Sequence, residues 1–179
     1  MTDIEYEVKA LDIDPADIAR RISAAGGVEA APTRAMRRYV YDTVPPVPGR
    51  WVRLRDTGDV VTLCVKEIST DAVDGTRETE VIVDDFTEAA ALLRLAGLTP
   101  RGYQENRRTS YKLGAVRLEV DEWPRIPPYL EIEADDEAQV WEAAATLGLA
   151  REGLTSINTT KVYSLYGIDL ESIVDLRFE

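Results

Sequence analysis

The chain has 179 residues, of which 45% are hydrophobic and 30% are charged, so it can fold around a core as one domain over residues 1–179. Its net charge of −12 argues against broad contact with a nucleic-acid backbone, which needs a basic face. No apolar run is long enough to cross a bilayer, so we expect neither a nucleic-acid nor a membrane partner.

The first third of the chain predicts a strand, a helix and a hairpin. Residues 4–9 alternate between charged and apolar side chains, as a half-buried strand does. An Asp-Pro pair then predicts a helix that starts at Pro15 and stops at Gly26. Residues 51–56 and 60–67 alternate again around a turn sequence, which predicts two paired strands.

The middle of the chain repeats this mixture of strands and helices. A strand is predicted over residues 77–83 and a helix from about Thr87 to Ala96, with a glycine as its stop. Residues 106–112 and 115–121 alternate on either side of a Leu-Gly turn, so they are predicted to form a second hairpin.

The last third is predicted to hold one more strand and one more full helix. The strand covers residues 129–133, and the helix runs from about Asp136 to Leu147. The segment after Thr155 is predicted to be a short helix or loop that closes the domain. Together these elements indicate an α+β fold with antiparallel strands whose apolar side is covered by helices.

The strands carry their charges in a repeated pattern. Side chains two positions apart on a strand share a face, so each pair lies together. Three strands carry Glu-x-Glu and one carries Arg-x-Arg, and these pairs are Glu5 and Glu7, Glu78 and Glu80, Glu131 and Glu133, and Arg53 and Arg55. A half-solvated sheet remains one interpretation. The separation of acids from bases favours another, a polar interior.

The residue types absent from the chain restrict its chemistry. There is no histidine and one cysteine, Cys64, which excludes His-activated nucleophiles, most zinc sites and an internal disulfide. Any metal would have oxygen ligands, which favours Mg²⁺ or Mn²⁺. The acidic, alternating N-terminal segment differs from a signal peptide, so we expect a cytoplasmic protein.

An ordered set of motifs resembles one known superfamily. The set runs from Glu5-Tyr6-Glu7-Val8-Lys9 through Val52-Arg53-Leu54-Arg55 to Tyr129-Leu130-Glu131-Ile132-Glu133. In this order the motifs resemble the CYTH superfamily, or triphosphate tunnel metalloenzymes, which includes class IV adenylyl cyclases and thiamine triphosphatases. The resemblance implies an eight-stranded antiparallel β tunnel (a barrel) with helices packed outside, and a triphosphate held inside it.

The resemblance also implies roles for individual residues. It makes Glu5, Glu7 and Lys9 catalytic, and it implies a metal site at Glu5, Glu7, Glu119, Asp121, Glu131 and Glu133. It implies phosphate contacts at Lys9, Arg53, Arg55, Lys66 and Arg108, and more weakly at Arg117 and Lys161. The cofactor would be Mg²⁺ or Mn²⁺.

One position departs from the family pattern. Many members have Lys-x-Arg where this chain has Asn106 and Arg108, so one basic contact is missing unless Arg107 or Lys112 replaces it.

Several functions therefore remain open. The leading hypothesis is a metal-dependent enzyme that hydrolyses inorganic triphosphate or a small organic triphosphate. The alternatives are a cyclase that converts ATP to cyclic AMP and pyrophosphate, a non-catalytic triphosphate or nucleotide sensor, and a plain structural domain. The partner would be a small-molecule triphosphate such as inorganic triphosphate or ATP, and a homodimer is left open.

Overall fold

The computed structural model describes residues 3–179. Its strands are β1 (Asp3–Ala10), β2 (Val28–Asp42), β3 (Arg50–Asp56), β4 (Val61–Ile68), β5 (Thr76–Val83), β6 (Pro100–Leu113), β7 (Val116–Glu122), β8 (Tyr129–Ala134), β9 (Leu154–Thr155) and β10 (Asp175–Leu176). Its helices are α1 (Pro15–Ala24), α2 (Phe86–Leu95), α3 (Glu137–Thr146) and α4 (Thr159–Leu165), with 3₁₀ turns η1 (Arg151–Gly153) and η2 (Leu170–Ser172).

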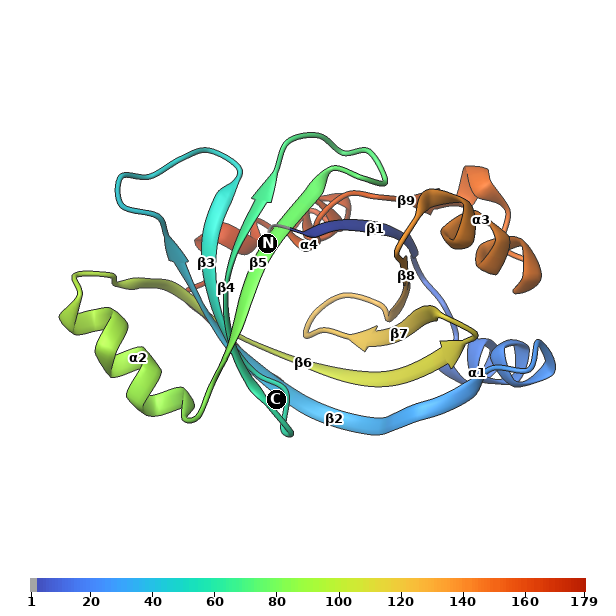
Figure 1. The fold of residues 1–179 in the computed structure, drawn as a ribbon, viewed down its shortest axis with the longest axis horizontal. Helices are drawn as coiled ribbons and strands as arrows, with labels where there is room; N and C mark the ends of the chain where they lie inside the picture. The colour runs from blue at the N-terminus through green and yellow to red at the C-terminus, as the bar shows by residue number, and fades with distance from the viewer. Residues whose placement is uncertain (1–2) are drawn as a thin grey trace.

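Eight of the strands close into a barrel (Figure 1). Their order is β6-β2-β3-β4-β5-β1-β8-β7, and β7 returns to pair with β6. Every pair in this ring is antiparallel, whereas the short β10 joins β6 in parallel and β9 adds to β1. The predicted α+β class, with an eight-stranded antiparallel barrel and helices outside it, is confirmed.

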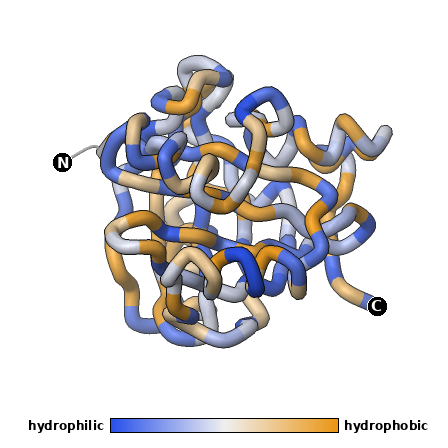
Figure 2. Tube along the Cα trace, turned by 90° about the vertical axis from the view of Figure 1, so that its right-hand side faces the viewer, coloured by the Kyte–Doolittle hydropathy of each residue, from blue (hydrophilic) through white to orange (hydrophobic). Residues whose placement is uncertain are grey.

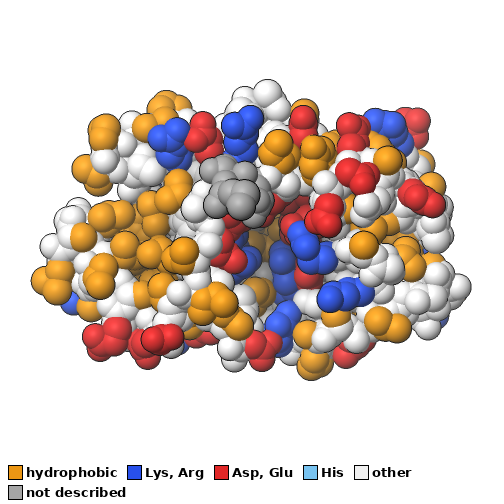
Figure 3. Space-filling view, in the orientation of Figure 1, with side chains coloured by type: hydrophobic (Ala, Val, Ile, Leu, Met, Phe, Trp, Pro, Cys, Tyr) orange, Lys and Arg blue, Asp and Glu red, His pale blue; other side chains and the backbone are white. Residues whose placement is uncertain are grey.

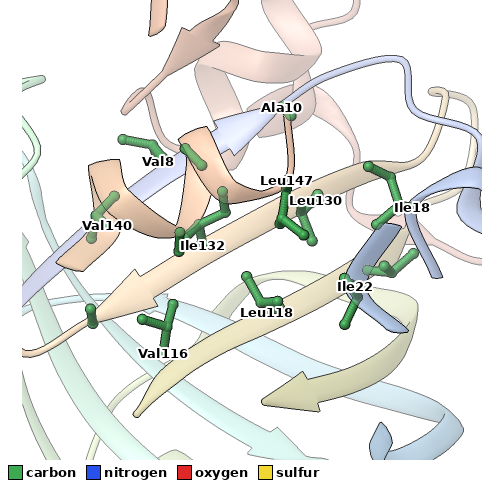
Figure 4. Packing of buried hydrophobic residues seen from close by; sticks show 14 residues of the cluster. Val8, Ala10, Ile18, Ile22, Val116, Leu118, Leu130, Ile132, Val140 and Leu147 are labelled. Carbon is green, nitrogen blue, oxygen red and sulfur yellow. The ribbon is translucent and has the colours of Figure 1, made fainter. Parts of the chain in front are cut away.

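The largest apolar core lies outside one wall of the barrel. Val8, Leu118 and Ile132 point outward from β1, β7 and β8, and each is fully buried. Ile22 of α1 and Val140 of α3 pack onto them, as Figure 4 shows. The same alternation that makes one face of these strands apolar leaves the opposite, charged face to point inward.

Two smaller clusters complete the packing. On the opposite wall, Phe86 and Leu93 of α2 pack against Tyr41 and Leu54 of β2 and β3. A third cluster joins α4 and the C-terminal residues to the β7–β8 connection and the start of β8; its buried members are Trp123, Ile126, Tyr129, Val162, Tyr163, Leu170 and Leu176. No helix among the described residues is long and apolar enough to span a membrane.

The ends of the predicted helices agree with their capping residues. Asp14, Asp85 and Asp136 are N-caps whose side chains accept hydrogen bonds from the first turns of α1, α2 and α3. Both predicted hairpins form, as β3–β4 and β6–β7. Figure 2 shows hydrophilic and hydrophobic stretches interspersed along the trace of the chain.

One long strand was not predicted. β2 has 15 residues and pairs with both β3 and β6. Its pairing with β6 shifts register between Glu29 and Ala31 and again between Ala31 and Arg34. Such bulges disturb the period of two, and the proline at position 32 further obscures the pattern of a strand.

Candidate functional site

The barrel encloses a cavity of about 1170 Å³, called here the barrel cavity. All eight strands of the ring contribute to its lining, and basic and acidic side chains meet at its opening in Figure 3. The charged lining residues from these strands are Glu5, Glu7, Lys9, Arg38, Asp42, Arg50, Arg53, Arg55, Lys66, Glu78, Glu80, Arg101, Arg108, Arg117, Glu119, Glu131 and Glu133. The charged faces therefore point into a shared interior, and a half-solvated sheet is excluded for these strands.

Nearly all of the predicted site residues lie in this lining. Lys161 reaches it from α4, and the predicted residues on the strands line it as well, with one exception. The exception is Asp121, which is fully buried and is not part of the lining. Its carboxylate accepts hydrogen bonds from Asn106 and Arg108, so it lies behind the cationic lining.

Lys9 joins two of the strands at the centre of the site. Its Nζ lies 2.9 Å from Glu7 and 3.4 Å from Glu131, which is its register partner on β8. Burial opposes the charge on Lys9, yet the two carboxylates hold its pKa above the usual value. Glu131 is also buried, and Lys9 and Arg108 lower its pKa to about 2. Lys9 and Glu131 are therefore both charged near neutral pH.

A second cluster joins β1, β3, β4 and β5. Lys66 lies 2.7 Å from Glu5 and 2.8 Å from Glu78, and Arg53 lies 2.8 Å from Glu78. Burial raises the pKa of Glu5 to about 8, with Glu78 adding to the rise and Lys66 opposing it. Arg53 and Lys66 outweigh the burial of Glu78 and hold its pKa well below the usual range. The carboxyl groups of Glu5 and Glu78 thus share one cation, Lys66.

Two further ion pairs lie toward the outside of the site. Arg117 of β7 pairs with Glu133 of β8. Lys161 pairs with Asp71, which belongs to the connection between β4 and β5. Both pairs involve half-exposed side chains, so solvent weakens them.

The arginines of β2 and β3 crowd positive charge along one wall of the barrel cavity, and among residues 3–179 Arg38 forms no ion pair. Burial, together with repulsion by Arg53, Arg55 and Arg108, lowers the pKa of Arg38 to about 9. Burial and the neighbouring Arg53 and Arg108 lower the pKa of Arg55 to about 10. Arginine normally keeps its proton under all conditions, so this crowding indicates a place for an anion.

The acidic lining has the chemistry of a site for a hard divalent cation. Its donors are carboxylate oxygens, which Mg²⁺ and Mn²⁺ prefer. The Oε2 atom of Glu119 is buried and has no hydrogen-bond partner, and burial raises the pKa of that carboxyl. Burial likewise raises the pKa of Glu5, although Lys66 lies 2.7 Å from it. Buried carboxylate oxygens are the donors that such a cation prefers, so the residues present fit this kind of ion.

The carboxylates are not gathered into a ready-made cage. Among residues 3–179, three ligand atoms come within 4.8 Å of one another at Cys64, Glu78 and Glu80. A thiol does not suit Mg²⁺, and both glutamates of that group already pair with Arg53. This group is therefore not the hard-cation site that the other carboxylates suit.

Sequence reasoning missed Arg38 and proposed the wrong replacements for the missing cation. Arg107 is exposed on the outer face of β6, one position before the inward-facing Arg108, and stacks on Phe178. Lys112 lies on the same strand face as Arg108 but is exposed near the end of β6. Neither lines the barrel cavity. Arg38 does, and Asn106 accepts a hydrogen bond from its Nη2. Adjacent arginines in an unpredicted strand gave no signal of which one points inward.

Comparison with protein families gives one match. The family described as CYTH domain matches residues 3–166, which is most of the chain. No curated protein matches.

Solved structures share the fold over nearly their whole length. PH1012 from Pyrococcus horikoshii is 24% identical with a TM-score of 0.74, covering 87% of this chain and 96% of that one. A protein from Vibrio parahaemolyticus described as a "putative adenylate cyclase" is 14% identical with a TM-score of 0.76, covering 90% and 98%. A "putative adenylyl cyclase" from Hippeastrum, described as revealing a dominant triphosphatase activity, is 15% identical with a TM-score of 0.59, covering 97% and 100%.

Proposed function

The chain belongs to the CYTH domain family, and on this basis we propose that it is a divalent-metal-dependent enzyme that hydrolyses inorganic triphosphate or a small organic triphosphate. The observation that carries the proposal is the enclosed cavity in which buried cations from several strands converge around space for a polyanion. A plain structural domain would not keep a buried arginine without an ion pair, as Arg38 is among residues 3–179, because buried charge without a partner is costly.

The phosphate chain would be held by basic side chains from five strands and from α4. The proposed contacts are Lys9, Arg53, Arg55, Lys66 and Arg108, with Arg117 and Lys161 at the outer part of the cavity. Arginine presents a planar fork that donates two hydrogen bonds to one phosphate. Asp121 would orient Arg108 from behind, since it accepts from both Nε and Nη2.

The metal would be held by carboxylates on β1 and β8. Glu5, Glu7 and Glu133 are the proposed ligands, with Glu119 and Glu131 beside them. Glu7 and Glu133 are register partners on adjacent strands, so their side chains share one part of the lining. When bound, the ion would neutralise phosphate oxygens and so lower the cost of charge in the transition state.

The side chains of the protein would promote the reaction by positioning the substrate and by stabilising the charge of the transition state. In hydrolysis a water oxygen forms a bond to the terminal phosphorus while the bridging P–O bond breaks, which gives orthophosphate and a shortened phosphate chain. Lys9 is proposed as the catalytic cation because its ammonium is completely buried at the centre of the site and remains protonated. It can stabilise charge that develops on the transferred group.

A second function is supported by the apolar part of the cavity lining. Val40, Val47, Pro48 and Trp51 lie in the same lining as the cations, which would suit an organic group attached to the phosphates. That arrangement favours ATP as an alternative substrate, converted to cyclic AMP and pyrophosphate by attack of the ribose 3′-hydroxyl on the α-phosphorus. We place hydrolysis first because the Hippeastrum protein of similar fold is described by its triphosphatase activity.

One assay separates these functions. The purified protein is incubated with inorganic triphosphate or with ATP, in Mg²⁺ or Mn²⁺, and the products are resolved. Release of orthophosphate supports the hydrolase, and cyclic AMP with pyrophosphate supports the cyclase. Binding of triphosphate without any product would show a sensor, and neither binding nor product would refute the proposal.

Substitutions on β1 test the site assignment. We expect Glu5→Gln and Glu7→Gln each to reduce turnover by about 100-fold or more, because an amide cannot supply the negative charge that the cation needs. The matched control is Glu142→Gln on the exposed face of α3, which should keep full activity. Thermal unfolding would verify that all three variants fold. Full activity in both β1 variants would show that the metal assignment is wrong.

A further inference from the structure

Arg38 differs from the other buried cations of the barrel cavity. The guanidinium comes from the middle of β2, and the residue is only 8% exposed. Within residues 3–179, no carboxylate forms an ion pair with it. By contrast, Lys9, Arg53, Lys66 and Arg108 each contact two carboxylates. A buried charge without a counter-charge is rare in folded proteins.

Neutral groups hold the guanidinium of Arg38 in place. Asn106 accepts a hydrogen bond from its Nη2, and the ring of Trp123 lies 4.5 Å from its central carbon. The Nδ2 atom of Asn106 in turn donates to Asp121 at 2.8 Å. These contacts fix the plane of the guanidinium and leave its charge in place, since neither an amide nor an indole carries a negative charge.

Nearby groups make this charge more costly. Arg53, Arg55 and Arg108 all repel it, and Asp121 offsets that repulsion only partly. The Nε atom of Arg38 is also buried without a hydrogen-bond partner. The fold thus holds an oriented cation at the cavity wall against both burial and repulsion, which is the arrangement expected where an anion completes the site.

We propose that Arg38 binds a phosphate group of the substrate in the barrel cavity, and that Asn106 is the positioning residue that orients its guanidinium. This inference rests on the proposed function. It assigns to the β2–β6 pair a phosphate contact that no sequence motif indicated, and it explains how the site keeps a cation on this wall although β6 carries an amide at position 106. The ligand chemistry is that of a linear polyphosphate whose charge must match several cations at once.

The test compares two arginines that are neighbours in the sequence. Arg38→Gln removes the charge inside the cavity, and Arg37→Gln makes the same change on the outer face, where Arg37 pairs with Asp56 and lies over Phe86. Affinity for inorganic triphosphate is measured by calorimetry without divalent ion, and KM and kcat are measured with Mg²⁺. We expect Arg38→Gln to weaken binding by about 10- to 100-fold, the loss typical of one hydrogen-bonded charge pair, and to raise KM. Arg37→Gln should stay within about twofold of the wild type, as exposed charges do.

A stability measurement separates binding from structure. Because Arg38 is an uncompensated buried charge, Arg38→Gln should unfold at the same temperature as the wild type or higher, although it binds more weakly. Arg38→Lys keeps the charge without the planar fork and should bind better than Arg38→Gln and worse than wild type. It also serves as the test should the glutamine variant fail to fold.

The binding measurements distinguish a failure of the proposed function from a failure of the role assigned to Arg38. Wild-type protein that binds no triphosphate would overturn the proposed function and this inference together. Wild-type protein that binds, with Arg38→Gln binding within twofold of it, would overturn the role of Arg38 alone. An equal loss in Arg37→Gln would show a general charge effect and would also overturn that role.

Discussion

The two faces of β1 and β8 are both buried and have opposite chemistry. Val8 and Ile132 are register partners whose side chains point outward into the helix-covered core. Lys9 and Glu131, the next pair along, point inward and form an ion pair. Consecutive residues on these two strands therefore belong in turn to an apolar outer layer and to a charged inner layer.

The difference shows which layer is complete without a ligand. The apolar layer needs nothing further, because its side chains are fully enclosed by α1 and α3. In the charged layer, as far as residues 3–179 show, Arg38 forms no ion pair and Glu119 has a buried oxygen without a hydrogen-bond partner. We infer that the apolar layer, which is the outer one, stabilises the barrel. The charged layer, which is the inner one, is arranged to bind ligands.

The largest predicted effect comes from a substitution in the outer layer. Leu118→Ala should destabilise the fold by about 2–5 kcal/mol, since it leaves a cavity at a fully buried position between β7 and the helices. Leu92→Ala is the control, because that leucine of α2 is 65% exposed and should change stability by no more than about 0.5 kcal/mol. Urea unfolding followed by circular dichroism measures both. A loss below about 1 kcal/mol for Leu118→Ala would contradict the assignment of stability to this layer.

A smaller effect concerns the inner layer and depends on pH. The pKa of Glu5 in the folded protein is raised to about 8, chiefly by burial. A carboxyl with a raised folded pKa stabilises the fold fully below its unfolded pKa, and this contribution is lost as pH rises through about 8. Glu5→Gln cannot lose a proton, so its unfolding temperature should rise relative to wild type between pH 6 and pH 9, in the presence of a chelator.

Two measurements sharpen this prediction. Glu142→Gln, on the exposed face of α3, should show a constant difference from wild type over the same range. Added Mg²⁺ should narrow the difference at pH 9 if the ion binds the ionised Glu5, because it replaces the missing positive charge. A difference between Glu5→Gln and wild type that does not change with pH would show that Glu5 is ionised in the folded protein at neutral pH.

Much of this arrangement could be predicted from local sequence patterns. Alternation on β1, β7 and β8 identified which side chains share a face, and Asp-capped helices supplied partners for the apolar side. Opposite faces of one strand can be assigned without knowing the partners of that strand. For this reason Glu7, Lys9 and Glu131 could be predicted together, and the structure places them in contact.

Features that depend on non-local pairing could not be predicted in this way. The bulges of β2 concealed a 15-residue strand, and only its register against β6 shows that Arg38 points inward and Arg37 outward. The position of Asp121 behind Arg108 likewise depends on the β6–β7 register. No short-range pattern carries that information, since it arises when the barrel closes.

The smallest predicted effect concerns the ion pair at the edge of the inner layer. Lys161 and Asp71 are 52% and 45% exposed, so the pair contributes only about 0–1 kcal/mol to stability. Asp71 nevertheless competes with a phosphate for the ammonium of Lys161, which lines the barrel cavity. Asp71→Asn should therefore leave the unfolding temperature nearly unchanged and tighten triphosphate binding by about two- to fivefold. Asp74→Asn removes the same charge from the same exposed connection without touching Lys161, so it measures the long-range effect of charge alone. If Asp71→Asn and Asp74→Asn bind triphosphate equally well, Lys161 does not exchange Asp71 for phosphate. The phosphate contacts would then come from the strands alone, without α4.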